Sequence, residues 1–146
     1  GKSDVMETDI RPINYLELEA AILNELLEKL QIENAILLGH SDGGSIALIT
    51  ASKYKDRIKM VICEAAHVFV EDITLNGIRE AVQAYETTNL PQKLQKYHGD
   101  KTETIFKAWT ETWLRNDFRN WNIEYLLPEI TSPLLFSILL KNCGFT

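Results

Sequence analysis

Residues 39–43 read Gly-His-Ser-Asp-Gly, which matches the pattern G-x-S-x-G. The pattern follows an apolar run, Ala35 to Leu38, and precedes a stretch rich in small residues. A serine on such a sharp strand-to-helix turn exposes its hydroxyl and can attack a carbonyl once a base removes its proton. The sequence therefore predicts Ser41 as a nucleophile. The alternative is a glycine-rich turn that carries an idle serine.

The residues on either side of Ser41 have predicted roles of their own. The backbone N–H of Asp42 would face a developing oxyanion at the positive end of the next helix. Positions 39 and 43 are both glycine, and we expect the reason to be steric, because side chains at these positions would collide across the turn. A phosphate-binding loop is excluded, because the segment matches neither G-x-x-x-x-G-K-[ST] nor G-x-G-x-x-G.

A base for Ser41 must come from a small set, because the chain has three histidines. His40 lies inside the turn, and we expect its side chain to point away from the serine. His98, in the segment Lys-Tyr-His-Gly-Asp, is predicted to be a turn residue. His67 follows a predicted strand that ends at Glu64, so these two could form a substitute acid–base pair at the carboxyl end of a sheet. The alternative is that both are hinge residues.

The elements that would position these residues can be read from apolar periodicity. Residues 14–30 have a helical apolar stripe, with Asn14 and Glu17 at capping-box spacing. Residues 35–38 and 58–63 are short apolar runs typical of strands buried on both faces. The segment 43–54 between them is predicted to be a helix. Together these segments predict a strand–helix–strand unit with a right-handed crossover.

After Ala66 the chain becomes helical and aromatic. We predict helices near residues 76–88, 91–97, 101–114 and 123–127, and a further strand over 134–136. Trp109 and Trp113 are four residues apart and so share one helix face. They either pack in a core or line an apolar substrate pocket.

Bulk properties exclude several classes of protein. The chain has 146 residues, 45% apolar and 25% charged, with a formal charge of −6. This balance predicts a globular chain with no basic face for nucleic acid or an anionic membrane. Cys63 and Cys143 have no metal-ligand spacing and are predicted to be reduced thiols. No cofactor or metal motif and no signal pattern is found, so the default location is cytoplasmic.

The segment 35–72, "AILLGHSDGGSIALITASKYKDRIKMVICEAAHVFVED", resembles the nucleophile elbow and following strand of α/β-hydrolase-fold serine hydrolases. The opening "GKSD" resembles the end of the G-x-G-x-S loop of that superfamily, and "LLPEITSPLL" resembles the lead-in to its next core strand. The resemblance implies an α/β class with a partial α/β-hydrolase fold. Residues 1–66 and 128–140 would form the core, and residues 67–127 a helical cap. It further implies an acyl-enzyme on Ser41, with a small-molecule ester or, less favourably, an amide as substrate.

The same resemblance implies that two catalytic residues are missing. In that fold the triad follows the order Ser, acid, His, with the acid soon after the strand at 134–136. Here no Asp or Glu follows Glu129, and no histidine follows His98. We therefore expect an internal piece of such a hydrolase with weak activity or none. The alternative is a non-catalytic, truncated member that forms a homo-oligomer through the bare sheet edge beside residues 35–38.

Overall fold

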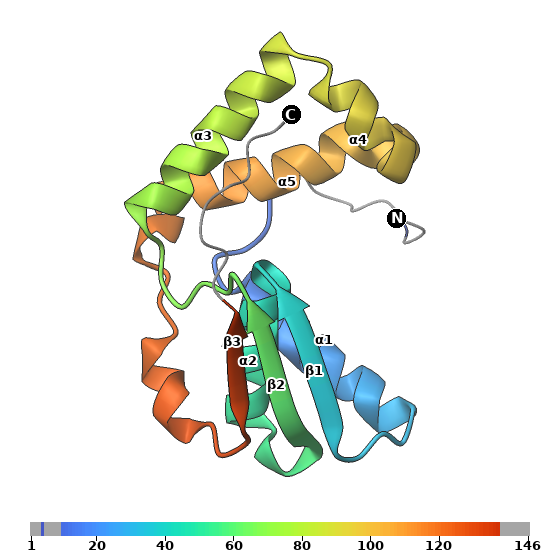
Figure 1. The fold of residues 1–146 in the computed structure, drawn as a ribbon, viewed down its shortest axis with the longest axis vertical. Helices are drawn as coiled ribbons and strands as arrows, with labels where there is room; N and C mark the ends of the chain where they lie inside the picture. The colour runs from blue at the N-terminus through green and yellow to red at the C-terminus, as the bar shows by residue number, and fades with distance from the viewer. Residues whose placement is uncertain (1–3, 5–9, 138–146) are drawn as a thin grey trace. The chain divides into compact units, whose positions relative to one another are not determined.

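A computed structural model of the protein describes Asp4 and residues 10–137 (Figure 1). The chain divides into two compact units, which are described separately. The sheet unit contains residues 14–69 and the described residues from 122 onward. The helical unit contains residues 70–121 and the described residues before 14. Within the described residues, no helix is both long enough and apolar enough to cross a membrane.

The sheet unit contains a three-stranded parallel sheet in the order β1-β2-β3. Its helices α1 and α2 lie on the same side of the sheet (Figure 1). Two short 3-10 helices, η1 and η4, precede β2 and β3. The bounds are α1 Tyr15–Lys29, β1 Ala35–His40, α2 Asp42–Lys53, η1 Lys55–Arg57, β2 Ile58–Glu64, η4 Glu124–Glu129 and β3 Leu134–Ser137. The predicted α/β class and strand–helix–strand unit are confirmed.

The core of the sheet unit lies on the helix-covered face of the sheet. Buried residues of β1 and β2 pack there with apolar residues of α1 and α2, namely Leu27, Ala35, Ala47, Leu48, Ala51, Ile58, Val61 and Cys63. On the opposite face, Leu38, Ile62 and Leu135 are paired in register across the three strands. Leu38 is 75% exposed and Leu135 is 53% exposed. The prediction that residues 35–38 are buried on both faces is therefore wrong, because α1 and α2 cover only one of them.

Helix α1 departs from its sequence pattern in two respects. Asn14 makes no side-chain capping hydrogen bond, since its backbone (φ −94°, ψ 25°) lacks the extended conformation of a capping residue. The predicted capping box is therefore wrong. Within the apolar stripe, Leu16 and Leu27 are buried, whereas Ile22 is 58% exposed. The helix packs mainly on α2, so only part of its stripe is covered.

The helical unit is built from α3 Asp72–Thr87, α4 Leu90–His98 and α5 Thr102–Leu114, with 3-10 turns Gly99–Lys101 (η2) and Phe118–Asn120 (η3). Its core is aromatic. The rings of Trp113 and Phe118 meet edge to face at a centroid distance of 5.2 Å, and Phe118 stacks on Trp121 at 5.7 Å. The residues predicted as a helix over 123–127 instead form the 3-10 helix η4 of the sheet unit.

Candidate active site

Ser41 occupies a strained position between β1 and α2. Its backbone has φ 52° and ψ −124°, a conformation that residues other than glycine rarely adopt. Hydrogen bonds hold this turn from both sides. The Ser41 N–H donates to the Glu64 carbonyl at 2.9 Å, and the Ser41 carbonyl accepts from the N–H groups of Gly44 (2.9 Å) and Ser45 (3.1 Å). Strain of this kind persists only where the surrounding structure enforces it.

Two glycines allow this turn, but they are not the predicted pair. A Cβ on Gly39 would lie 2.1 Å from the Gly43 carbonyl oxygen, so position 39 must be glycine. A Cβ on Gly43 would meet nothing within 4 Å, so the predicted steric need for glycine there is wrong. The second close approach involves Gly44, whose Cβ would lie 2.7 Å from the Cβ of Ala66. The requirement is shifted by one residue because β2 and the loop after it pack against α2 at Gly44.

Two groups at the turn are unpaired within the described part of the chain. The Asp42 N–H, at the first position of α2, has no acceptor there, and the Ser41 hydroxyl makes no hydrogen bond there. The α2 helix has 12 residues, and its positive end stabilises negative charge near that N–H. The arrangement presents a hydroxyl and a hydrogen-bond donor side by side.

The Asp42 side chain is held by Tyr15, which the sequence did not indicate. The Tyr15 hydroxyl donates to Oδ2 of Asp42 at 2.6 Å, and Tyr15 is only 3% exposed. The other carboxylate oxygen, Oδ1, is buried without a partner in the described structure. Since 27 residues separate the two side chains, no local motif signals the contact. Tyr15 thereby ties the start of α1 to the start of α2 directly after Ser41.

The substitute acid–base residues lie near the turn but do not form a pair. Glu64 is in register with His40 at the ends of β2 and β1. Its carboxylate makes no hydrogen bond or ion pair within the described residues. His67 is held through its backbone, since the Ser45 hydroxyl donates to its carbonyl at 2.6 Å and its N–H donates to Ser45 Oγ at 3.1 Å. None of these groups is hydrogen-bonded to the Ser41 hydroxyl.

Other candidate residues contribute less to this site. Burial raises the pKa of the Cys63 thiol to about 11, so it is neutral at physiological pH and not a nucleophile. Cys143 lies outside the described residues. Trp113 is 2% exposed in the core of the helical unit, and Trp109, 39% exposed, meets Phe106 edge to face. Among the described residues, no group of His, Cys, Asp and Glu could hold a metal ion.

Comparison with known proteins gives a consistent assignment. Residues 12–139 match the family model described as alpha/beta hydrolase fold. The human serine hydrolase BPHL is 31% identical over 133 residues, which is 85% of this chain and 44% of that protein. The mouse serine hydrolase BPHL is 35% identical over 83 residues, 55% of this chain and 28% of that protein. The chain thus spans less than half the length of these curated relatives.

Solved structures agree on the fold. An alpha/beta hydrolase enzyme from a Medee basin deep-sea metagenome library has a TM-score of 0.58 at 24% identity, over 93% of this chain and 56% of that one. A thermophilic esterase from Thermogutta terrifontis has a TM-score of 0.56 at 20% identity, over 94% of this chain and 57% of that one. The strained serine, the parallel sheet and the match over residues 12–139 together show that the chain belongs to the alpha/beta hydrolase fold family.

Proposed function

We propose that Ser41 is the nucleophile of a serine hydrolase that acts on small-molecule esters and, less favourably, on amides. The observation that carries this proposal is the positive φ of Ser41, 52°, which is held between a strand end and a helix start. In the proposed reaction Oγ attacks the carbonyl carbon while a base takes its proton, and the base then gives that proton to the alcohol as it leaves. Water hydrolyses the acyl-enzyme, which releases the carboxylic acid and restores the serine.

Asp42 supplies the proposed oxyanion donor through its backbone N–H. This group is unpaired within the described residues, as such a donor must be, and it lies at the positive end of α2. The general base has no such local candidate, because no described histidine is hydrogen-bonded to Ser41. We therefore expect the base and its acid to come from outside residues 10–137. The 146-residue chain by itself should therefore react and hydrolyse esters only slowly.

The test is intact-mass analysis after exposure to a fluorophosphonate probe, with Ser41→Ala as control. We expect one slow adduct that maps to the peptide containing Ser41 and is absent from the control. Circular dichroism of both proteins establishes that they are folded. An adduct that persists in Ser41→Ala, or no adduct on folded protein, would refute the proposed nucleophile.

A second candidate function is non-catalytic assembly, in which copies of the chain join through the sheet. It is favoured by the apolar face formed by Ile36, Leu38 and Leu135, which are each more than half exposed. Within the described residues β1 and β3 each pair only with β2, so the outer edge of each strand is free. No charged residue in β1 discourages strand pairing there.

Light scattering coupled to size-exclusion chromatography tests this alternative. A homo-oligomer at micromolar concentration that dissociates in Leu38→Lys would support it. A monodisperse monomer would exclude it. The two proposals are separable, because labelling at Ser41 does not depend on the oligomeric state.

A further inference from the structure

Tyr15 and Asp42 join the first residues of two helices beside the proposed nucleophile. Tyr15 begins α1, and Asp42 begins α2 directly after Ser41. The Tyr15 hydroxyl donates to Oδ2 of Asp42 at 2.6 Å, a distance typical of a charge-assisted bond to a carboxylate. Tyr15 is 3% exposed, and Oδ1 of Asp42 is buried as well. The contact is therefore buried between α1 and α2.

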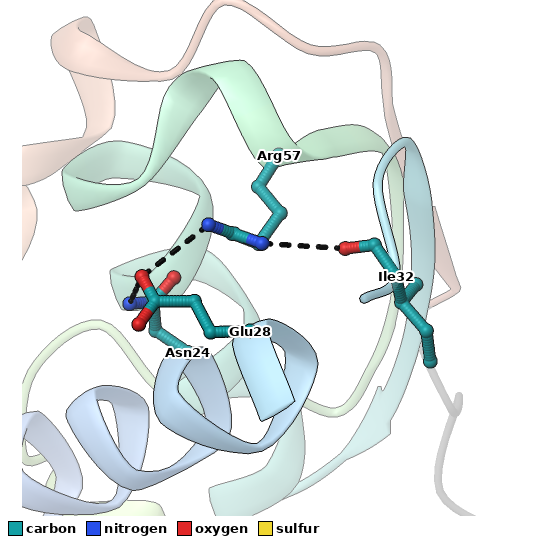
Figure 2. Close-up of polar contacts among 4 residues, drawn as sticks. All are labelled: Asn24, Glu28, Ile32 and Arg57. Atoms are coloured by element: carbon teal, nitrogen blue, oxygen red, sulfur yellow. Dashed lines mark hydrogen bonds and ion pairs between the residues drawn. The ribbon is translucent and has the colours of Figure 1, made fainter. Parts of the chain in front are cut away.

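Helix α1, which carries Tyr15, is also tied down at its other end. Figure 2 shows Arg57 of η1 between the Glu28 carboxylate and the Ile32 carbonyl. Nη2 of Arg57 lies 3.3 Å from Oε1 of Glu28, and Nη1 lies 3.5 Å from the Ile32 oxygen. Because both ends of α1 are bound to neighbouring elements, the Tyr15 hydroxyl is presented from a fixed position.

Asp42 carries two groups with opposite effects on an oxyanion. Its backbone N–H, at the positive end of α2, would stabilise the negative charge that forms when Ser41 attacks a carbonyl. Its own carboxylate would repel the same charge if it turned toward it. In the structure Oδ2 binds Tyr15, Oδ1 is buried, and neither oxygen is hydrogen-bonded to the Ser41 hydroxyl within the described residues. The carboxylate is thus engaged with α1, whereas the N–H remains available.

We propose that Tyr15 is a positioning residue for the reaction at Ser41. Its hydroxyl holds the Asp42 carboxylate against α1 and so keeps this negative charge away from the oxyanion that forms at the Asp42 N–H. Tyr15 touches neither the substrate nor the reacting atoms, and it acts through Asp42 alone. This role presupposes a nucleophilic Ser41 and so rests on the proposed function.

The test is a double-mutant cycle on the rate at which an uncharged fluorophosphonate probe labels the 146-residue chain, followed by intact mass. Tyr15→Phe keeps the ring and removes only the hydroxyl. We expect it to label about tenfold more slowly, because the released carboxylate can approach the developing oxyanion. In the Asp42→Asn background the same change should alter the rate by less than about twofold, because no charge remains to be held. A purely structural role of the hydroxyl would slow labelling in both backgrounds.

Two further variants sharpen the test. Asp42→Glu keeps the charge but moves it by one methylene from the contact with Tyr15, so it should also label several-fold more slowly. It tests the role of the contact with Tyr15 in place, even if Tyr15→Phe does not fold. Arg57→Gln breaks the contact at the other end of α1 (Figure 2). Because it loosens the helix without touching Asp42, its rate should stay within about twofold of the parent's.

Circular dichroism establishes that each protein is folded. Parental rates in Tyr15→Phe or Asp42→Glu, equal slowing by Tyr15→Phe in both backgrounds, or equal slowing in Arg57→Gln would overturn the role of Tyr15 and leave the proposed nucleophile standing. No adduct on the folded parent would refute the nucleophile itself, and the role of Tyr15 with it.

Discussion

Two glycines of the same motif should respond in opposite directions to alanine. In Gly39→Ala the new Cβ would lie 2.1 Å from the Gly43 oxygen and 2.3 Å from its carbonyl carbon. Non-bonded carbon atoms pack at about 3.5–4.0 Å, so backbone in the first turn of α2 must move by roughly 1 Å or more. In Gly43→Ala the new methyl group meets nothing within 4 Å.

The magnitudes follow from these contacts. Overpacking costs about 1–3 kcal/mol, and each disturbed elbow hydrogen bond adds about 1 kcal/mol, so Gly39→Ala should lose about 3–5 kcal/mol. Gly43→Ala should gain about 0.5–1 kcal/mol, because alanine loses less conformational entropy than glycine in a helix. At about 2–4 °C per kcal/mol, the melting temperatures of the two variants should differ by about 10 °C or more.

Urea unfolding followed by circular dichroism measures both effects. Gly77→Ala is the matched control, since Gly77 lies in helix α3 and a Cβ there would also meet nothing within 4 Å. It should be stabilised as much as Gly43→Ala. The reasoning is refuted if Gly39→Ala is as stable as the parent, or if Gly43→Ala is destabilised to a similar extent.

Four further predictions concern single side chains. Ser41→Gly should stabilise the chain by about 1 kcal/mol, because it relieves a strained φ worth about 1–3 kcal/mol at some entropic cost; a loss of stability on urea unfolding would contradict this. Tyr15→Phe should cost about 1–3 kcal/mol, since it removes the donor to the second oxygen of Asp42 while the first is already buried and unpaired, and a cost below about 0.5 kcal/mol would count against that contact. Burial raises the pKa of the Cys63 thiol from 9.0 to about 11, so between these two pH values the thiol ionises in the unfolded chain and not in the folded one. The free energy of unfolding should therefore fall by up to roughly 2–3 kcal/mol as the pH rises from 9.0 to about 11. Urea titrations of Cys63→Ala over the same pH range should lack this fall. Trp113→Ala should cost about 3–5 kcal/mol in thermal unfolding because it empties the aromatic core, and near-parental stability would argue against that packing.

Local signals predicted the elements well, and long-range contacts explain where their bounds differ. The strand expected over residues 35–38 continues to His40, because His40 pairs with Glu64 on β2. The helix expected from residue 76 begins at Asp72. There Arg119, 47 residues away, binds the Asp72 carboxylate at 2.6 Å. Neither partner can be recognised from the residues at the element's own end.

The candidate site divides in the same way. Ser41 and Gly39 were predictable because the strand, the turn and the helix that position them are consecutive in sequence. Gly44 was missed because its neighbour, Ala66, comes from the loop after β2. Tyr15 was missed because helical periodicity identifies the apolar stripe of α1 but does not show that the Tyr15 hydroxyl will contact Asp42. Periodicity also could not show which part of the α1 stripe would be covered.

The elbow and the proton-transfer groups have separate physical origins. Ser41 is held by Gly39, Gly44 and the Glu64 carbonyl, all within the sheet unit, so the turn forms without any catalytic base. Stability alone does not explain the serine, since glycine would adopt φ 52° and ψ −124° with less strain. A hydroxyl is retained at this position at a cost in stability, beside an unpaired N–H at a helix start. The proposed use of that hydroxyl as a nucleophile accounts for the strained serine, which an idle turn does not, while the unpaired N–H is common to helix starts.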